Sequence, residues 1–395
     1  MGGGQRRRRR RRGRGRRGRG GRRVTGGGLA GARRLVIKIG SSLLVGRDGT
    51  INRPWLTALS EDIAACRRRG INMIVVTSGA IALGRRHLQL PDGPLRLDEK
   101  QAAAASGQIR LAHAYQEALA EHGMSVAQVL LTLDDSDNRR RYLNARNTLE
   151  TLLKLGAVPV INENDTVATQ EIRFGDNDRL AARVAQMVGA DALVLFSDID
   201  GLYTADPRRD ENARFIPEVR ELTAEIEAMA GDPGSALGSG GMVTKLQAAR
   251  IALAAGCRMA IAPGKPLHPL RAIEEGGRCT WFEASQEPLT ARKQWIAGAV
   301  QPQGRLVADA GACRALLQGR SLLPAGVAAV DGDFQKGDAV IVVNGDGRPV
   351  ARGLSAYSSD DARRIIGSKS GDFEGRLGYR GPDEMIHRDD LVIET

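Results

Sequence analysis

Short apolar segments alternate with longer amphipathic segments along most of this chain, and this alternation constrains the fold more than any other feature. The run LVIKI at 35–39 is almost entirely apolar, and 72–78, 126–131 and 191–197 have the same character. Strands that are apolar on both sides belong to parallel sheets covered by helices. The sequence therefore predicts an α/β sandwich with a mainly parallel central sheet.

Helical patterns separate these strands. Pro54 opens one that continues to Arg69 and ends at Gly70, with proline at the start and glycine just past the end. The same criteria predict further helices at 98–121, 142–155, 178–188 and 241–255, and further strands at 157–161 and 257–262.

The pattern changes near 287–303, after which short strands separated by Gly and Asp turns are expected at 304–309, 338–344 and 348–355. A chain of 395 residues also exceeds what one hydrophobic core usually serves. We therefore predict four parts: an Arg/Gly-rich tail at 1–34, a main domain at 35–290, a linker at 291–303 and a small β-rich domain at 304–395.

The net charge of +12 comes from the tail, because residues 1–34 carry 15 arginines and no acid, so the remainder has a net charge of −3. The body of the protein is thus excluded as a generally basic nucleic-acid binder. The tail is predicted to be disordered. Three interpretations stay open for it: an RNA-binding RGG-like segment, a passive extension, or upstream sequence translated from a mis-set start, and the last two are favoured.

Other residue types narrow the class of protein. No run approaches the roughly 18 apolar residues of a membrane span, so none is predicted. The four cysteines are scattered, which favours a reducing, cytoplasmic compartment over a disulfide framework. The five histidines form no recognisable metal motif, so no protein-built metal site is expected.

Small residues follow several predicted strands, at the edge where ligands bind in open parallel sheets. Such loops let backbone N–H groups approach phosphate oxygens. Each of these loops alone is weak evidence for a binding site, and it is their recurrence at strand ends that favours a phosphate-binding site. A P-loop motif and protein-kinase signatures are both missing from the sequence, so a different scaffold is expected. The loops are 40–42, 78–80, 162–165, 197–198 and 238–241.

Two lysines stand out near these loops. Lys38 interrupts an apolar strand, and Lys245 follows a glycine-rich loop at the start of a predicted helix. The apolar neighbours of Lys38 indicate a buried strand, so a solvated position on an edge strand explains this lysine poorly. An unpaired ammonium in a buried strand would be costly, so Lys38 should have a charged partner or ligand. We interpret both lysines as cations that meet a transferring phosphoryl group.

Eight motifs run in order from about residue 35 to 265: VIKIGSSLL (36–44), VTSGAIALG (76–84), QAAAASGQ (101–108), LNARNTL (143–149), VPVINENDTVA (158–168), FGDNDRLAA (174–182), SDIDGLYTADP (197–207) and GSGGMVTKLQAA (238–249). They resemble the amino-acid kinase family. VINEND followed by GDND resembles the glutamate 5-kinases within it, and SLLPAGV (321–327), GVAAVDGDFQKGD (326–338) and HRDDLV (387–392) resemble the PUA domain of bacterial members.

The resemblance implies ATP-dependent phosphorylation of the side-chain carboxylate of L-glutamate, the first step of proline biosynthesis, with feedback inhibition by proline. It assigns Lys38 and Lys245 to catalysis and Asp198 to orienting them. It further assigns ATP binding to Lys38, Ser197, Asp198, Ser239, Gly240, Gly241, Met242, Val243, Thr244 and Lys245, and substrate binding to Ser78, Asp165 and Asn177. Asp176 and Asp178 could hold the substrate ammonium, but Asp176 could equally be a helix cap.

These roles fit the chemistry, since a carboxylate ionised at pH 7 attacks phosphorus without a base, and Mg²⁺ can be held chiefly by ATP. A homo-oligomer and a separate reductase that receives the product are also expected. Two alternatives remain: a kinase for another carboxylate such as N-acetylglutamate, and an RNA-binding protein acting through the tail and PUA domain. Few aromatics and no dense basic stripe in 304–395 favour a structural or regulatory PUA domain.

Overall fold

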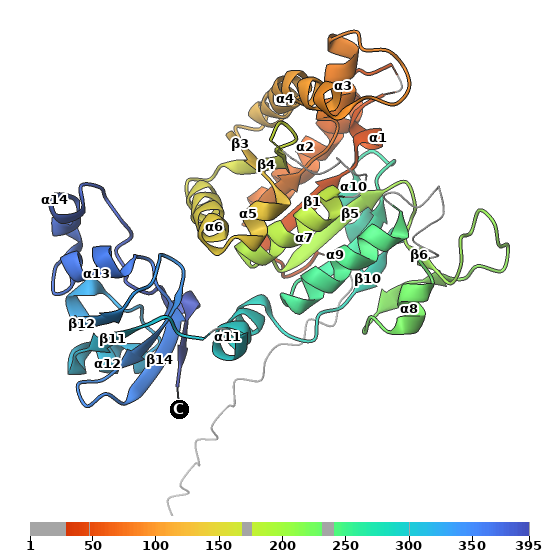
Figure 1. The fold of residues 1–395 in the computed structure, drawn as a ribbon. Coiled ribbons are helices and arrows are strands. Elements are labelled where there is room, and N and C mark those ends of the chain that lie inside the picture. Colours follow the sequence, from red (N-terminus) through yellow and green to blue (C-terminus); the bar gives the residue numbers. More distant parts are fainter. Residues whose placement is uncertain (1–28, 47, 168–175, 231–240, 300, 395) are drawn as a thin grey trace, which may run out of the picture.

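The computed structural model describes residues 29–46, 48–167, 176–230, 241–299 and 301–394. They form a large sheet flanked by helices and a smaller sheet in the C-terminal part (Figure 1). The expected tail falls mostly outside the described residues. Its last part nevertheless belongs to the large domain, because Leu29 is only 2% exposed and Arg34 is the first residue of β1.

The large sheet has eight strands: β1 (Arg34–Ile39), β2 (Asn72–Val76), β3 (Val126–Leu131), β4 (Val158–Glu163), β5 (Ala192–Ser197), β8 (Glu218–Val219), β9 (Arg258–Pro263) and β10 (Thr280–Phe282). Their order is β3-β4-β2-β1-β5-β9-β10-β8. Neighbouring strands are parallel except β9 and β10, which are antiparallel. The predicted mainly parallel central sheet is confirmed.

Helices cover both faces of this sheet (Figure 1). Alternate residues of β1 point to opposite faces, so Leu35 and Ile37 join one apolar core and Val36 joins the other. The first core includes α2 (Arg53–Arg68) and α4 (Leu97–Ala120), and the second includes α6 (Arg139–Lys154), α7 (Asp176–Val188) and α9 (Met242–Ala254). This burial on both sides explains why the strands are apolar almost throughout.

Shorter elements complete the large domain: α1 (Ser41–Leu44), α3 (Ala80–His87), α5 (Leu133–Asp137), β6 (Leu202–Tyr203), β7 (Phe215–Ile216), α8 (Ala224–Ala228) and α10 (Pro269–Glu274). None of the described helices has the length and apolar character needed to cross a bilayer.

The C-terminal domain is β-rich, as predicted, with strand order β12-β11-β13-β14-β15. Phe334, Tyr357 and Phe373 are buried in its core, whereas Tyr379 is 46% exposed. Three of its four aromatic side chains therefore serve packing. The elements are β11 (Gly304–Ala308), α12 (Ala310–Leu317), η1 (Pro324–Gly326), β12 (Val327–Gly332), β13 (Ala339–Val343), β14 (Pro349–Leu354), α13 (Ser359–Ile365), η2 (Ser370–Asp372), α14 (Phe373–Leu377), η3 (Arg388–Asp390) and β15 (Leu391–Ile393).

A helix, α11 (Pro288–Ala299), occupies most of the segment expected to be a linker, and it lies between the two sheets (Figure 1). Ile296 of α11 packs with Leu143 of α6 and with Ala339 and Leu354 of the C-terminal domain. The connection is thus a packed joint rather than an extended linker.

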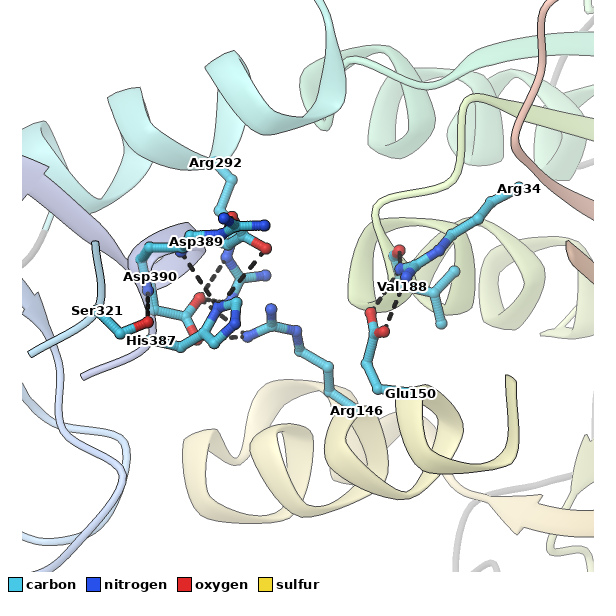
Figure 2. A network of polar contacts seen from close by, with 10 residues as sticks. Arg34, Arg146, Glu150, Val188, Arg292, Ser321, His387, Asp389 and Asp390 are labelled. Atoms are coloured by element: carbon cyan, nitrogen blue, oxygen red, sulfur yellow. Dashed lines mark hydrogen bonds and ion pairs between the residues drawn. The ribbon is translucent and has the colours of Figure 1, made fainter. Parts of the chain in front are cut away.

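An ion triad lies beside this joint (Figure 2). Asp390 accepts hydrogen bonds from Arg146 of α6, at 2.7 and 2.9 Å, and from Nε of Arg292 of α11, at 2.7 Å. Each of the three side chains is at most 15% exposed. Glu150, one helical turn after Arg146, receives Nη2 of Arg34 at 2.8 Å, so α6 is tied to the C-terminal domain and to β1 at once (Figure 2).

Candidate active site

Lys38 projects from the end of β1 toward the face of the sheet that carries α7 and α9. It is 8% exposed, and its neighbours in β1 are fully buried. The strand ends at Ile39, and a Cβ added to the following Gly40 would lie 4.0 Å from the lysine Nζ. The backbone therefore leaves open the approach to this ammonium, at the edge where parallel sheets bind ligands.

Asp178, in the first turn of α7, holds both predicted catalytic lysines. Its Oδ1 lies 2.6 Å from Nζ of Lys38, and its Oδ2 lies 3.2 Å from Nζ of Lys245. Asp178 is 1% exposed and Lys245 is 7% exposed. The structure therefore brings the two lysines together, as the sequence predicted, around one buried carboxylate.

The electrostatics of this cluster favour an anionic ligand. Burial opposes ionisation of Asp178, but Lys38 and Lys245 together outweigh it and hold the pKa of this carboxyl below its usual value. One carboxylate then faces two ammonium groups, which leaves one positive charge in excess at a nearly buried position. A phosphoryl group in transfer, with negative charge spread over its oxygens, matches that excess.

Asp198 lies elsewhere in the site. The family resemblance implied that Asp198 orients the lysines, but the carboxylate in contact with both ammonium groups is that of Asp178. Asp198 follows β5, is exposed, and pairs with Arg208 at 3.1 Å and with the hydroxyl of Ser197 at 3.2 Å. The motif placed an acid next to a strand end, and only the folded arrangement shows which acid lies between the lysines.

The start of α9 supplies backbone donors beside Lys245. Gly241 is its N-cap residue, and Met242, Val243 and Thr244 form the first turn, whose N–H groups have no partner within the helix. The Thr244 hydroxyl contacts Asp178 Oδ2 at 3.1 Å and the carbonyl of Gly241 at 3.0 Å, which links this turn to the lysine cluster. Ser239 and Gly240 lie outside the described residues.

The predicted substrate residues lie just after β2, just after β4 and in the first turn of α7. Nδ2 of Asn177 donates to Ser78 Oγ at 2.7 Å, to the carbonyl of Thr77 at 2.9 Å and to Asn162 Oδ1 at 3.1 Å. Asp165 follows β4 and is 8% exposed. Ser78 and Asn177 are thus in direct contact, and Asn177 is adjacent in the chain to the lysine-bound Asp178.

Asp176 is the first residue of α7, but its side chain lies outside the described part of the structure. The choice between ligand and cap for Asp176 therefore stays open.

Two residues of this site, Asn162 and Gln108, carried no assignment from the sequence. Both are at least nine-tenths buried, and Asn162 Nδ2 donates to Gln108 Oε1 at 2.8 Å. They belong to the motifs VINEND and QAAAASGQ, so the signal was present. Asparagine and glutamine are common in loops and on helices, and the motifs alone did not distinguish them from their neighbours.

Close packing of α3 against α4 positions this side of the site. A Cβ on Gly84 of α3 would lie 1.7 Å from the carbonyl oxygen of Ala103, and one on Gly107 of α4 would lie 1.8 Å from that of Ala80. Only glycine allows the two helix backbones to approach this closely. Since α3 begins just after Ser78 and Gln108 follows Gly107, the crossing places both residues.

Comparison with known proteins gives a consistent result. The chain matches the amino acid kinase family over residues 33–263 and the PUA domain over residues 304–376. It is 72% identical over 367 residues to a glutamate 5-kinase of Paramagnetospirillum magneticum, covering 93% of this chain and 99% of that protein. It is 65% identical over 361 residues to a glutamate 5-kinase of Rhodospirillum rubrum, covering 91% and 96%. Glutamate 5-kinase 1 of Rhizobium meliloti is 60% identical over 361 residues, covering 91% and 92%.

Proposed function

Because this chain belongs to the amino acid kinase family, and within it to the glutamate 5-kinases, we infer that it transfers the γ-phosphoryl group of ATP to the side-chain carboxylate of L-glutamate. The observation that carries this function is the Lys38–Asp178–Lys245 cluster at the carboxyl edge of the sheet. The product, L-glutamyl 5-phosphate, makes this the first step of proline biosynthesis.

The chemistry needs alignment and charge neutralisation more than proton transfer. The glutamate side chain is a carboxylate at pH 7, so its oxygen forms a bond to the γ-phosphorus while the bond to the oxygen bridging to ADP breaks. Lys38 and Lys245 stabilise the charge on the transferring group, and Asp178 fixes where the two ammonium groups lie. Holding the reactants in line provides the rest of the acceleration.

We propose that ATP lies along the start of α9 and the end of β5, where Gly241–Lys245, Ser197 and Asp198 are found. The N–H groups of the first turn of α9, which have no partner within the helix, and its helix dipole favour phosphate there. Mg²⁺ would arrive bound to the ATP phosphates and would neutralise part of their charge, since it needs only one or two protein carboxylates. The described residues contain no cluster of three or more His, Cys, Asp or Glu suited to a metal.

For glutamate, we propose a site formed by Ser78, Asp165 and Asn177. Ser78 and Asn177 are in contact, and the peptide bond joins Asn177 to Asp178, so a ligand held there lies beside the lysine cluster. Asp165 adds a nearly buried carboxylate just beyond the carboxyl end of β4.

Inhibition by proline, assembly into a homo-oligomer, transfer of the labile product to a reductase and a cytoplasmic location remain proposals that the family suggests. RNA binding by the PUA domain also stays a prediction, and burial of three of its four aromatic side chains favours a structural or regulatory role.

One assay tests the activity directly. With Mg-ATP and glutamate, the enzyme should release ADP, and hydroxylamine should trap the acyl phosphate as a hydroxamate. Hydroxamate formed from N-acetylglutamate but not from glutamate would show that the proposed substrate is wrong. Lys245→Ala should lower turnover by roughly 10²-fold or more, as removal of other charge-stabilising groups does. Exposed Lys293 on α11 provides the matched control, Lys293→Ala.

A further inference from the structure

A chain of side-chain amides runs from α4 through β4 to α7 beneath the proposed glutamate site. Gln108 Oε1 accepts from Asn162 Nδ2 at 2.8 Å, and Asn162 Oδ1 accepts from Asn177 Nδ2 at 3.1 Å. Gln108 is 8% exposed and Asn162 is 2% exposed. Both residues are buried, so Asn162 depends on its neighbours for hydrogen bonds, whereas Nε2 of Gln108 has no partner among the described residues.

The direction of each hydrogen bond in this chain of amides follows from its contact with Thr77. The carbonyl of Thr77 can only accept, so the atom of Asn177 that lies 2.9 Å from it must be the NH₂ group. The atom of Asn162 facing that NH₂ must then be its oxygen. Its own NH₂ group consequently faces Gln108, which must present an oxygen.

This polarity decides what Asn177 presents to a ligand. The two hydrogens of its NH₂ group are shared among Thr77, Ser78 and Asn162, and its Oδ1 remains buried with no hydrogen-bond partner among the described residues. A buried acceptor without a partner is costly. An ammonium group satisfies such an oxygen well, because a charged donor forms a stronger hydrogen bond than a neutral one.

We propose that Gln108 is a positioning residue for substrate selection: by accepting from Asn162 it keeps the oxygen of Asn162 toward Asn177, which helps to hold Asn177 with its carbonyl oxygen toward the α-ammonium of the substrate. The proposal rests on glutamate being the substrate. Gln108 acts through Asn162, so it alters recognition of one substrate group without touching the phosphoryl group.

Without Gln108, no acceptor on α4 keeps the NH₂ group of Asn162 turned away from Asn177. Gln108→Met keeps a side chain of similar length but removes the oxygen that accepts from Asn162 Nδ2, leaving a buried NH₂ group unpaired. Asn162 is then free to turn its NH₂ group toward that of Asn177, where two donors face each other, and Asn177 is held only by Thr77 and Ser78. Gln108→Glu retains an acceptor oxygen toward Asn162 whether or not its carboxyl is protonated, and should restore the chain.

The experiment compares glutamate with glutarate, which has both carboxylates but lacks the ammonium. Dissociation constants for the two ligands are measured by calorimetry on the full chain, with KM and kcat measured in parallel. Gln108→Met should weaken glutamate binding about tenfold, as loss of a buried hydrogen bond does, while glutarate binding changes much less. The ratio of the two constants should return to within about threefold of the wild type in Gln108→Glu, which keeps the acceptor.

Exposed Gln116 on the same helix supplies the control variant Gln116→Met, for which the ratio should not change. An unchanged ratio in Gln108→Met, equal weakening of ATP binding, or failure of Gln108→Glu to restore the ratio would each overturn the role of Gln108. A wild type that selects glutamate over glutarate but forms no hydroxamate would instead overturn the proposed kinase function, leaving the positioning role supported by the ratios.

Discussion

The ammonium of Lys38 lies 2.6 Å from Oδ1 of Asp178, and the second oxygen of the same carboxylate receives Lys245. One acid at the start of α7 thus ties β1 to α9. The two cations are held in place before any ligand binds, and charge that is already positioned needs no reorganisation during phosphoryl transfer.

Asp178→Asn should lower kcat by about 10²-fold or more, because both lysines lose the charge that positions them. The amide is close in size to the carboxylate, so steady-state kinetics can be compared with little change in packing, and circular dichroism can verify the fold. Asp198→Asn is the matched control, since Asp198 is exposed and pairs with Arg208. A larger loss of kcat in Asp198→Asn would return the orienting role to Asp198.

Asp165→Ala should mainly raise the KM for glutamate, with smaller changes in kcat and in the KM for ATP. The side chain is 8% exposed and lies just beyond the carboxyl end of β4, and Ser78, which contacts Asn177, follows the neighbouring strand β2. Titration of each substrate at saturating levels of the other gives the two KM values. If only the ATP requirement changed, the assignment of Asp165 to the glutamate site would be wrong.

The joint between the domains should depend on pH through Asp390. Burial opposes its ionisation, but Arg292 and Arg146 outweigh burial and lower its pKa. A lowered folded-state pKa contributes stability above the pKa of an unfolded aspartate, about 3.9, and this contribution disappears as the pH falls through the folded value. Contact between the domains should therefore weaken in acid, which small-angle scattering and denaturant unfolding can follow.

Asp390→Asn should destabilise the joint at pH 7 by about 3–5 kcal/mol, because it leaves two buried arginines without their counter-charge. Asp389→Asn is the control, since Asp389 is adjacent and 41% exposed. The two variants should converge in stability at low pH, where Asp390 is protonated in the wild type as well. A persistent difference in acid would mean that the charge of Asp390 is not what stabilises the joint.

Much of the large domain could be predicted because its strands are buried on both faces and therefore apolar throughout. The strand expected at 126–131 has those bounds in the structure, and the helix expected at 98–121 spans Leu97–Ala120. Glycine and proline mark the ends of helices through their own backbone geometry, and such local preferences can be recognised in the sequence. The lysine pair was predictable for a related reason: Lys38 is conspicuous in an apolar strand.

What could not be predicted depends on contacts between distant segments. Asp178 and Asp198 both lie near strand ends or helix starts, and only the fold decides which one reaches Lys38 and Lys245. Residues 291–303 were expected to be a linker, and the sequence did not reveal that α11 is packed there. Ile296 is buried by α6 and the second sheet together, a surface that neither segment shows alone.

The crossing of α3 and α4 gives the last prediction. Gly84→Ala would place a Cβ 1.7 Å from the carbonyl oxygen of Ala103 and 2.8 Å from the backbone nitrogen of Gly107. Backbone atoms cannot rotate away, so the helices must separate, at a cost of about 1–3 kcal/mol or more for such overpacking. Because the crossing also places Ser78 and Gln108, the KM for glutamate should rise as the melting temperature falls.

Gly375→Ala in α14 is the matched control, since a Cβ there meets nothing within 4 Å. Alanine is favoured over glycine within a helix by roughly 0.5–1 kcal/mol, so this variant should be neutral or slightly more stable. Differential scanning calorimetry and glutamate titration of both variants separate the clash from a general effect of adding a methyl group. A Gly84→Ala protein with wild-type melting temperature and wild-type KM would show that the two helices tolerate a wider crossing and that their spacing does not set the glutamate site.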